Sequence, residues 1–121
     1  MKKMIFTLML LCCATLVKGQ SISYIETSSS WYYIYDQNGK KIYTMTKSVG
    51  ELQGYCASFF IVKTSSWYYL YSPMGKKLCT LSVSYVGEIL SVSGDTFTSR
   101  CGSWIYTWSK EGKKIATKTA H

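Results

Sequence analysis

Two carboxylates and one histidine set the catalytic chemistry that this chain could perform. Glu51 and Glu88 stand in matching phrases, "VGEL" and "VGEI", and a pair of carboxyl groups can supply the acid and base of glycoside hydrolysis. Carboxylates in repeated phrases are usually solvent-exposed, which makes a hydrolase the less favoured interpretation. The single histidine is the last residue, His121, which removes most nucleophile–base pairs and most transition-metal sites. We therefore expect no enzyme, no metal site and no cofactor.

A second set of residues could bind sugars. Three segments place aromatic residues at alternate positions, so that in each segment the rings share one face of a strand. They are Trp31, Tyr33 and Tyr35; Trp67, Tyr69 and Tyr71; and Trp104, Tyr106 and Trp108. Such rings either stack on sugars or fill a hydrophobic core. We expect Trp31, Trp67 and Trp104 to be core, and we expect Tyr35, Tyr71 and Trp108, beside the turns, to contact a ligand.

A third set of residues is basic. Pairs of lysines directly follow three turn glycines: Lys40 and Lys41, Lys76 and Lys77, and Lys113 and Lys114. Hairpins that point the same way would gather six ammonium groups at one rim. That rim either keeps the hairpin ends solvated or attracts an acidic partner, such as an anionic glycan or lipid head groups. Nucleic acid is the least favoured partner, since the charge is modest and export separates the protein from it.

The elements that carry these residues are predicted to be β-hairpins. One phrase occurs three times, as "SSWYYIYDQNGKKIYT", "SSWYYLYSPMGKKLCT" and "GSWIYTWSKEGKKIAT". Each copy has an alternating strand, a four-residue turn that ends in glycine, and a second strand. With two weaker strands per unit and no helical periodicity, the chain is predicted to be all-β: an antiparallel meander of roughly ten strands in three repeats of about 36 residues.

The segment "VSGDTFTSRCGSWIYTWSKEGKKIATKT" resembles one blade of a β-propeller that reads "G-D-x-F … W-x-Y … G-K-x-I". The whole chain is similar to small exported bacterial proteins that carry this repeat and have no established activity. The resemblance implies blade-like four-stranded units. Three units are fewer than the four to eight blades of the usual closed ring. We therefore expect either a barrel closed within one chain or propeller-like blades that close by dimerisation.

The first residues, "MKKMIFTLMLLCCATLVKGQ", predict a secretory signal peptide over residues 1–19. Acylation at Cys12 or Cys13 is the less favoured alternative, and the apolar run is too short to span a membrane. The remaining residues, 20–121, form one domain with 11 basic and 6 acidic residues. Its odd number of cysteines leaves at least one thiol outside any internal bridge. We expect Cys79 in a buried slot, with Cys56 and Cys101 as the candidate pair.

These patterns together favour a secreted or periplasmic, non-enzymatic β-repeat domain. Its expected partner is a glycan, a cell-surface component or another protein, and homodimerisation is left open. The alternative is a structural module whose aromatic surfaces and strand edges serve self-assembly.

Overall fold

The computed structural model describes residues 21–120, so the predicted signal peptide, the two leader cysteines and His121 lie outside the described residues. The described chain contains eleven strands and two short helical segments. The strands are β1 (Tyr24–Thr27), β2 (Trp31–Tyr35), β3 (Lys41–Thr46), β4 (Glu51–Tyr55), β5 (Phe60–Lys63), β6 (Trp67–Tyr71), β7 (Lys77–Ser82), β8 (Glu88–Ser93), β9 (Thr96–Cys101), β10 (Trp104–Ser109) and β11 (Lys114–Thr119).

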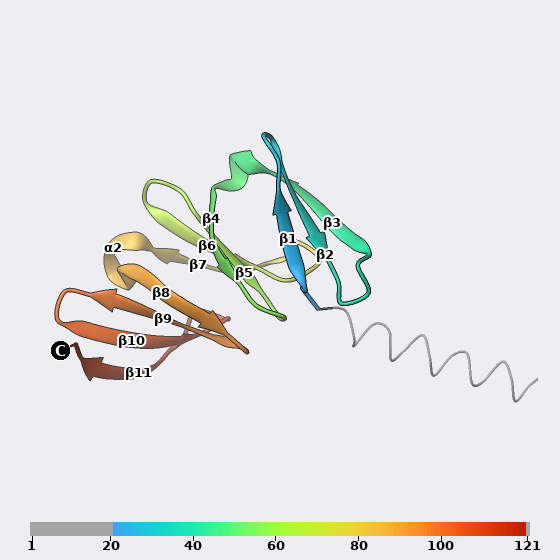
Figure 1. Cartoon of the computed structure of the whole chain (residues 1–121). Helices are drawn as coiled ribbons and strands as arrows, with labels where there is room; N and C mark the ends of the chain where they lie inside the picture. The colour runs from blue at the N-terminus through green and yellow to red at the C-terminus, as the bar shows by residue number, and fades with distance from the viewer. Residues whose placement is uncertain (1–20, 121) are drawn as a thin grey trace, which may run out of the picture.

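The strands form three separate antiparallel sheets that follow one another along the chain (Figure 1). The first sheet has the order β1-β2-β3, the second β4-β5-β6-β7, and the third β11-β10-β9-β8. This confirms the all-β prediction. Within residues 21–120 each sheet stays open, and no strand joins two of them into a closed barrel.

The three predicted hairpin turns are present. In each, the amide of the turn glycine donates to a carbonyl three residues earlier: Gly39 to Asp36, Gly75 to Ser72 and Gly112 to Ser109, over 2.9–3.0 Å. The glycines have φ values of 78°, 83° and 90°, a region that residues with a Cβ rarely adopt. A shift in strand register follows each turn. The bulged hairpins expected from the glycine spacing are therefore confirmed.

Two short helical segments connect the sheets, and the sequence pattern did not predict them. A 3₁₀ turn, Lys47–Val49, joins β3 to β4, and the helix α2, Val83–Val86, joins β7 to β8. Each is followed by a glycine, Gly50 or Gly87, at which the chain crosses close to the backbone of the next sheet. Each segment is only one turn long, which is too short for a hydrophobic period to show.

The first and second sheets enclose one hydrophobic cluster. The first sheet contributes Ile25, Tyr32 and Ile34, and the second contributes Phe60 and Val62, all of them buried. Tyr69 and Tyr71 of β6 pack against the same cluster. Because Tyr69 and Tyr71 alternate with Trp67, the tryptophan-bearing face of the second sheet faces the first sheet.

The second and third sheets enclose the other cluster. The opposite face of the second sheet supplies Ile61, Tyr68 and Leu70, and the third sheet supplies Phe97 and Trp108. All five side chains are at most 2 % exposed. The second sheet is therefore covered on both faces, as its position between the other two in Figure 1 shows.

The prediction that Trp31, Trp67 and Trp104 form the core is wrong. Their side chains are 42 %, 46 % and 48 % exposed, respectively. Each tryptophan is the first residue of its strand. Trp67 and Trp104 are therefore at the margin of a covered face, and within residues 21–120 no sheet covers the face that carries Trp31. The core is made instead by residues further along the strands, on both faces, such as Leu70 and Trp108.

The three thiols of the described chain are free, and the candidate bridge between Cys56 and Cys101 is not formed. Cys56 Sγ lies 3.0 Å from the carbonyl oxygen of Gly94, before β9, whereas Cys101 is the last residue of β9. A strand of this length separates them by about 17 Å at 3.3 Å per residue, far beyond the reach of a disulfide. Cys79 is half-buried, and burial, with a smaller contribution from Glu111, raises the pKa of its thiol to about 11.

Replacing a buried and an exposed residue of β6 tests whether the core contains Leu70 or the repeated tryptophan. Leu70→Ala should lower the free energy of unfolding by about 2–5 kcal/mol, because Leu70 is fully buried between two sheets. Trp67→Ala should lower it by about 1 kcal/mol, since half of the side chain is already in water. Urea unfolding of both variants measures this, and a larger loss for Trp67→Ala than for Leu70→Ala would contradict the assignment.

Gly87 should tolerate no side chain. A Cβ there would lie 2.1 Å from the Arg100 carbonyl oxygen, whereas a Cβ on Gly94 would meet nothing within 4 Å. Both glycines have positive φ, 86° and 61°, so Gly94→Ala should cost about 1–2 kcal/mol from backbone strain alone. Gly87→Ala adds the clash and should cost about 3 kcal/mol or more. Equal losses for the two variants in thermal unfolding would refute the close approach.

Candidate functional site

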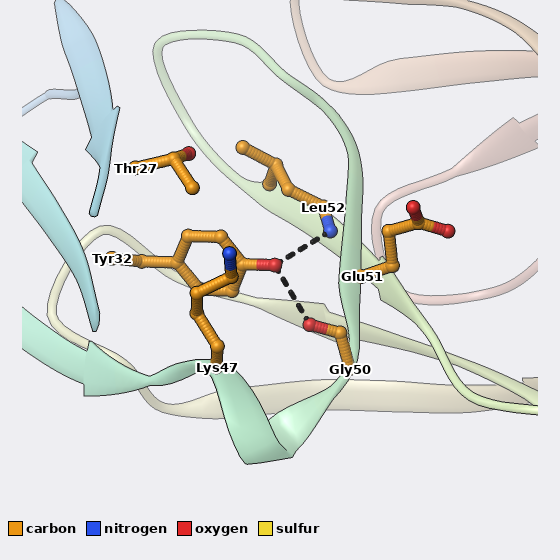
Figure 2. Close-up of a pocket in the computed structure, with 6 residues that line it drawn as sticks. All are labelled: Thr27, Tyr32, Lys47, Gly50, Glu51 and Leu52. Atoms are coloured by element: carbon orange, nitrogen blue, oxygen red, sulfur yellow. Dashed lines mark hydrogen bonds between the residues drawn. The ribbon is translucent and has the colours of Figure 1, made fainter. Parts of the chain in front are cut away.

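An open hollow of about 520 Å³ lies where the first sheet meets the chain entering β4. Figure 2 shows the Tyr32 hydroxyl at its centre, between Gly50 and Leu52. The hydroxyl donates to the Gly50 carbonyl over 2.8 Å and accepts from the Leu52 amide over 3.0 Å. Tyr32 thus ties the connection between sheets to the first sheet.

The repeat-equivalent tyrosine makes the same kind of contact in the next connection. Tyr68 donates to the carbonyl of Gly87 over 2.6 Å. Burial, with a smaller contribution from the charge of Glu88, raises the pKa of Tyr68. Because both hydroxyls are used to fix glycine-containing connections, the hollow at Tyr32 is explained by structural hydrogen bonding, and it is not the candidate site.

The candidate site is the outer face of the first sheet. We call the face that carries the repeated tryptophan the tryptophan face of each sheet. In the second and third sheets the neighbouring sheet covers this face, but within residues 21–120 nothing covers it in the first sheet. It presents Trp31, Tyr33 and Tyr35 of β2, with Tyr24 of β1 paired beside Tyr35. Trp31 and Tyr24 are 42 % and 53 % exposed, respectively.

The rings on this face are held by one another and by charged neighbours. Tyr24 and Tyr35 stack at 6.3 Å with 25° between their planes. The Lys41 ammonium lies 4.5 Å from the centre of the Tyr33 ring, within the range of a cation–π contact. Tyr35 donates to Glu26 Oε1 over 2.9 Å. This hydrogen bond to the carboxylate is the main cause that raises the pKa of Tyr35.

Flat rings flanked by one cation and one carboxylate can bind in two ways. Aromatic faces take up apolar surface, either the C–H face of a sugar or side chains of a protein. Lys41 and Glu26 can exchange hydrogen bonds with hydroxyl, amide or charged groups at the edge of that surface.

The three predicted ligand-contacting aromatics are placed in three different surroundings. Tyr35 lies on the free face described above. Tyr71 stacks on Phe60 at 5.4 Å in the first cluster, and burial raises its pKa. Trp108 is 1 % exposed, stacks on Phe97 and donates from Nε1 to Ser99 Oγ over 2.9 Å. Trp108 is therefore a core residue with no surface to offer a ligand.

The six lysines divide into two groups. The second lysine of each pair lies over a tyrosine of its own tryptophan face: Lys41 over Tyr33, Lys77 over Tyr69 and Lys114 over Tyr106, at 4.5, 4.7 and 3.8 Å. The first lysine of each pair is exposed at its turn: Lys40, Lys76 and Lys113. Lys41 and Lys77 are exposed as well, whereas Lys114 is partly buried.

Glu51 and Glu88 begin strands of different sheets, β4 and β8, and both are exposed. Each stands opposite a basic residue of the neighbouring strand, Lys63 or Arg100. Within residues 21–120 no three His, Cys, Asp or Glu side chains gather in a group that could hold a metal ion.

Sequence reasoning missed two members of the free face, Tyr24 and Glu26. Both lie on β1, and their pairing with Tyr35 and Tyr33 puts them beside the aromatic residues of β2. Their counterparts beside the covered faces are Phe60 and Val62 in the second sheet. The replacement of two apolar residues by a tyrosine and a glutamate was the available signal that this face is in contact with water.

Comparisons with known proteins add no relative: no family model matches the chain, and neither the curated proteins nor the solved structures give a match. None of the helical segments in the described part of the chain is long and apolar enough to cross a membrane.

The raised pKa of Tyr35 should depend on Glu26. Glu26→Gln removes the negative charge that accepts the hydroxyl proton, so the pKa of Tyr35 should fall toward the usual value of about 10. The pKa of Tyr71, which burial raises, should stay unchanged. Titration of ¹³C-labelled tyrosine by NMR measures both groups. An unchanged Tyr35 titration in the variant would show that the Glu26 contact is not made.

Proposed function

We propose that this chain is an exported, non-enzymatic binding module that engages its partner through the tryptophan face of the first sheet. Export rests on the charged and apolar pattern of residues 1–19. Binding rests on one comparison within the molecule. Of three equivalent aromatic faces, two are covered by a neighbouring sheet, and no part of residues 21–120 covers the third.

The partner classes are those compatible with exposed rings. A glycan, a cell-surface component or a protein surface can each cover Trp31 and the Tyr24–Tyr35 stack. The stack of three sheets acts as the scaffold that holds these rings in a fixed plane, which lowers the entropy lost on binding. The propeller-like interpretation belongs to this proposal, since each sheet would be one blade whose tryptophan face meets the preceding blade.

The test compares equivalent tryptophans on open and covered faces. Trp31→Ala should abolish or weaken at least about tenfold whatever binding the protein shows, because it removes the largest ring of the open face. Trp67→Ala is the matched control, since Trp67 is equally exposed but lies on a covered face. A glycan array and light scattering of the secreted protein provide the two readouts. The proposal is overturned if Trp31→Ala binds and associates as the unmodified protein does.

A further inference from the structure

The two internal interfaces show what a tryptophan face packs against. The tryptophan face of the second sheet covers Ile34 and Tyr43 of the first, and that of the third covers Leu70 and Cys79 of the second. Ile34 pairs with Tyr43, and Leu70 with Cys79, on the face opposite the tryptophan face of their own sheets. The same contact, between the tryptophan face of one sheet and the opposite face of the sheet before it, is thus made twice.

A glycine of the hairpin turn marks each of these contacts. A Cβ on Gly75 would lie 2.2 Å from the Tyr43 ring of the preceding sheet, and one on Gly112 would lie 2.9 Å from Cys79 Sγ. Each turn therefore sits against the last strand of the sheet before it. In the repeat, Gly39 is equivalent to Gly75 and Gly112, and Ala116 is equivalent to Tyr43 and Cys79. Gly39 and Ala116 are therefore the one such pair of positions that forms no contact within the stack. Gly39 has nothing within 4 Å of its Cβ position, and Ala116 is exposed.

Two complementary faces are thus left open at the ends of the stack. The front is the tryptophan face of the first sheet. The back is the opposite face of the third sheet, where Leu90, Ile105, Thr107 and Ala116 line a hollow of about 380 Å³. Leu90 is 48 % exposed. In the second sheet, the residues equivalent to Ile105 and Thr107 are Tyr68 and Leu70, which the third sheet buries.

Each open face carries a charged residue at a position that is apolar in the interface between the first and second sheets, and on the front Lys41 lies beside it. Glu26 on the front pairs with Tyr33 of the neighbouring strand. The equivalent residue of the second sheet, whose front is covered, is Val62, which pairs with Tyr69. Lys118 on the back pairs with Ile105. The equivalent residue of the first sheet is Met45, which pairs with Tyr32. Met45 and Val62 belong to one buried cluster. A front meeting a back would therefore bring an anion and a cation to a place where the internal interface has two apolar side chains.

We propose that a second copy of this chain docks front to back on the open faces, with Gly39 of one copy against Ala116 of the other and Glu26 near Lys118. The inference rests on the proposed function, because it names the partner that the front face binds. Two copies joined at both ends would hold six sheets, within the four to eight that closed rings contain. The contact is heterologous, since the front and back are different surfaces, and it can close by rotation.

Charge reversal on each face tests this docking. Glu26→Lys and Lys118→Glu should each weaken self-association of the secreted protein about tenfold or more by placing like charges together. The equimolar mixture of the two variants should restore it, because each front then meets a back of opposite charge. Glu111→Lys and Lys113→Glu are the matched controls, since both residues are exposed at a turn. Sedimentation velocity over a wide protein concentration measures association, and circular dichroism checks folding.

Three results would overturn the inference: an unmodified protein that stays monomeric at every concentration, single variants that associate as it does, or a mixture no better than its components. A monomer that binds a glycan, and loses that binding in Trp31→Ala, would overturn self-docking and leave the proposed function standing. A monomer with no ligand in any assay would count against both.

Discussion

Both faces of the second sheet are covered, and the stacking of the other two sheets on it holds the molecule together. Phe60 and Val62 point to one neighbour while Ile61 points to the other, and all three are fully buried. This explains why residues 60–62 of β5 are all apolar, where an ordinary half-exposed strand would alternate. The stacking brings the turn glycines Gly75 and Gly112 against the preceding sheet, so that any side chain at either position would collide with it.

A stack built this way has two ends that differ from its interior. A repeat unit cannot bury a hydrophobic face alone, so end units either carry polar residues or find a partner. The first sheet combines both features, with Glu26 among the exposed rings of Tyr24 and Trp31. The third sheet has threonines and Lys118 around Leu90 and Ile105. Faces of mixed polarity suit contacts that form and dissociate, and binding through them would be sensitive to salt.

The sequence predicted the local structure well. Alternation and the glycine turns identify the hairpins, and the 36-residue period identifies the three units, because these features depend on residues close together in the chain. The two helical turns after β3 and β7 were missed because a single turn has no period to detect.

Which face of each strand is buried could not be derived in the same way. Alternation separates Trp67 and Tyr69 from Tyr68 and Leu70, but it does not reveal that neighbours cover both faces. Nor does equivalence in the repeat guarantee equal burial. Trp108 occupies the position of Tyr35 and is buried, because a sheet lies over it and none lies over Tyr35 within the described residues. Burial depends on contacts between units, and the sequence of one unit does not contain that information.

The measurement closest to the central claim is a set of nuclear Overhauser effects between neighbouring sheets in solution. The account predicts cross-peaks from the Tyr43 ring to the α-protons of Gly75, and from the β-protons of Cys79 to those of Gly112. Absence of both sets of cross-peaks in the folded protein would contradict this stacking.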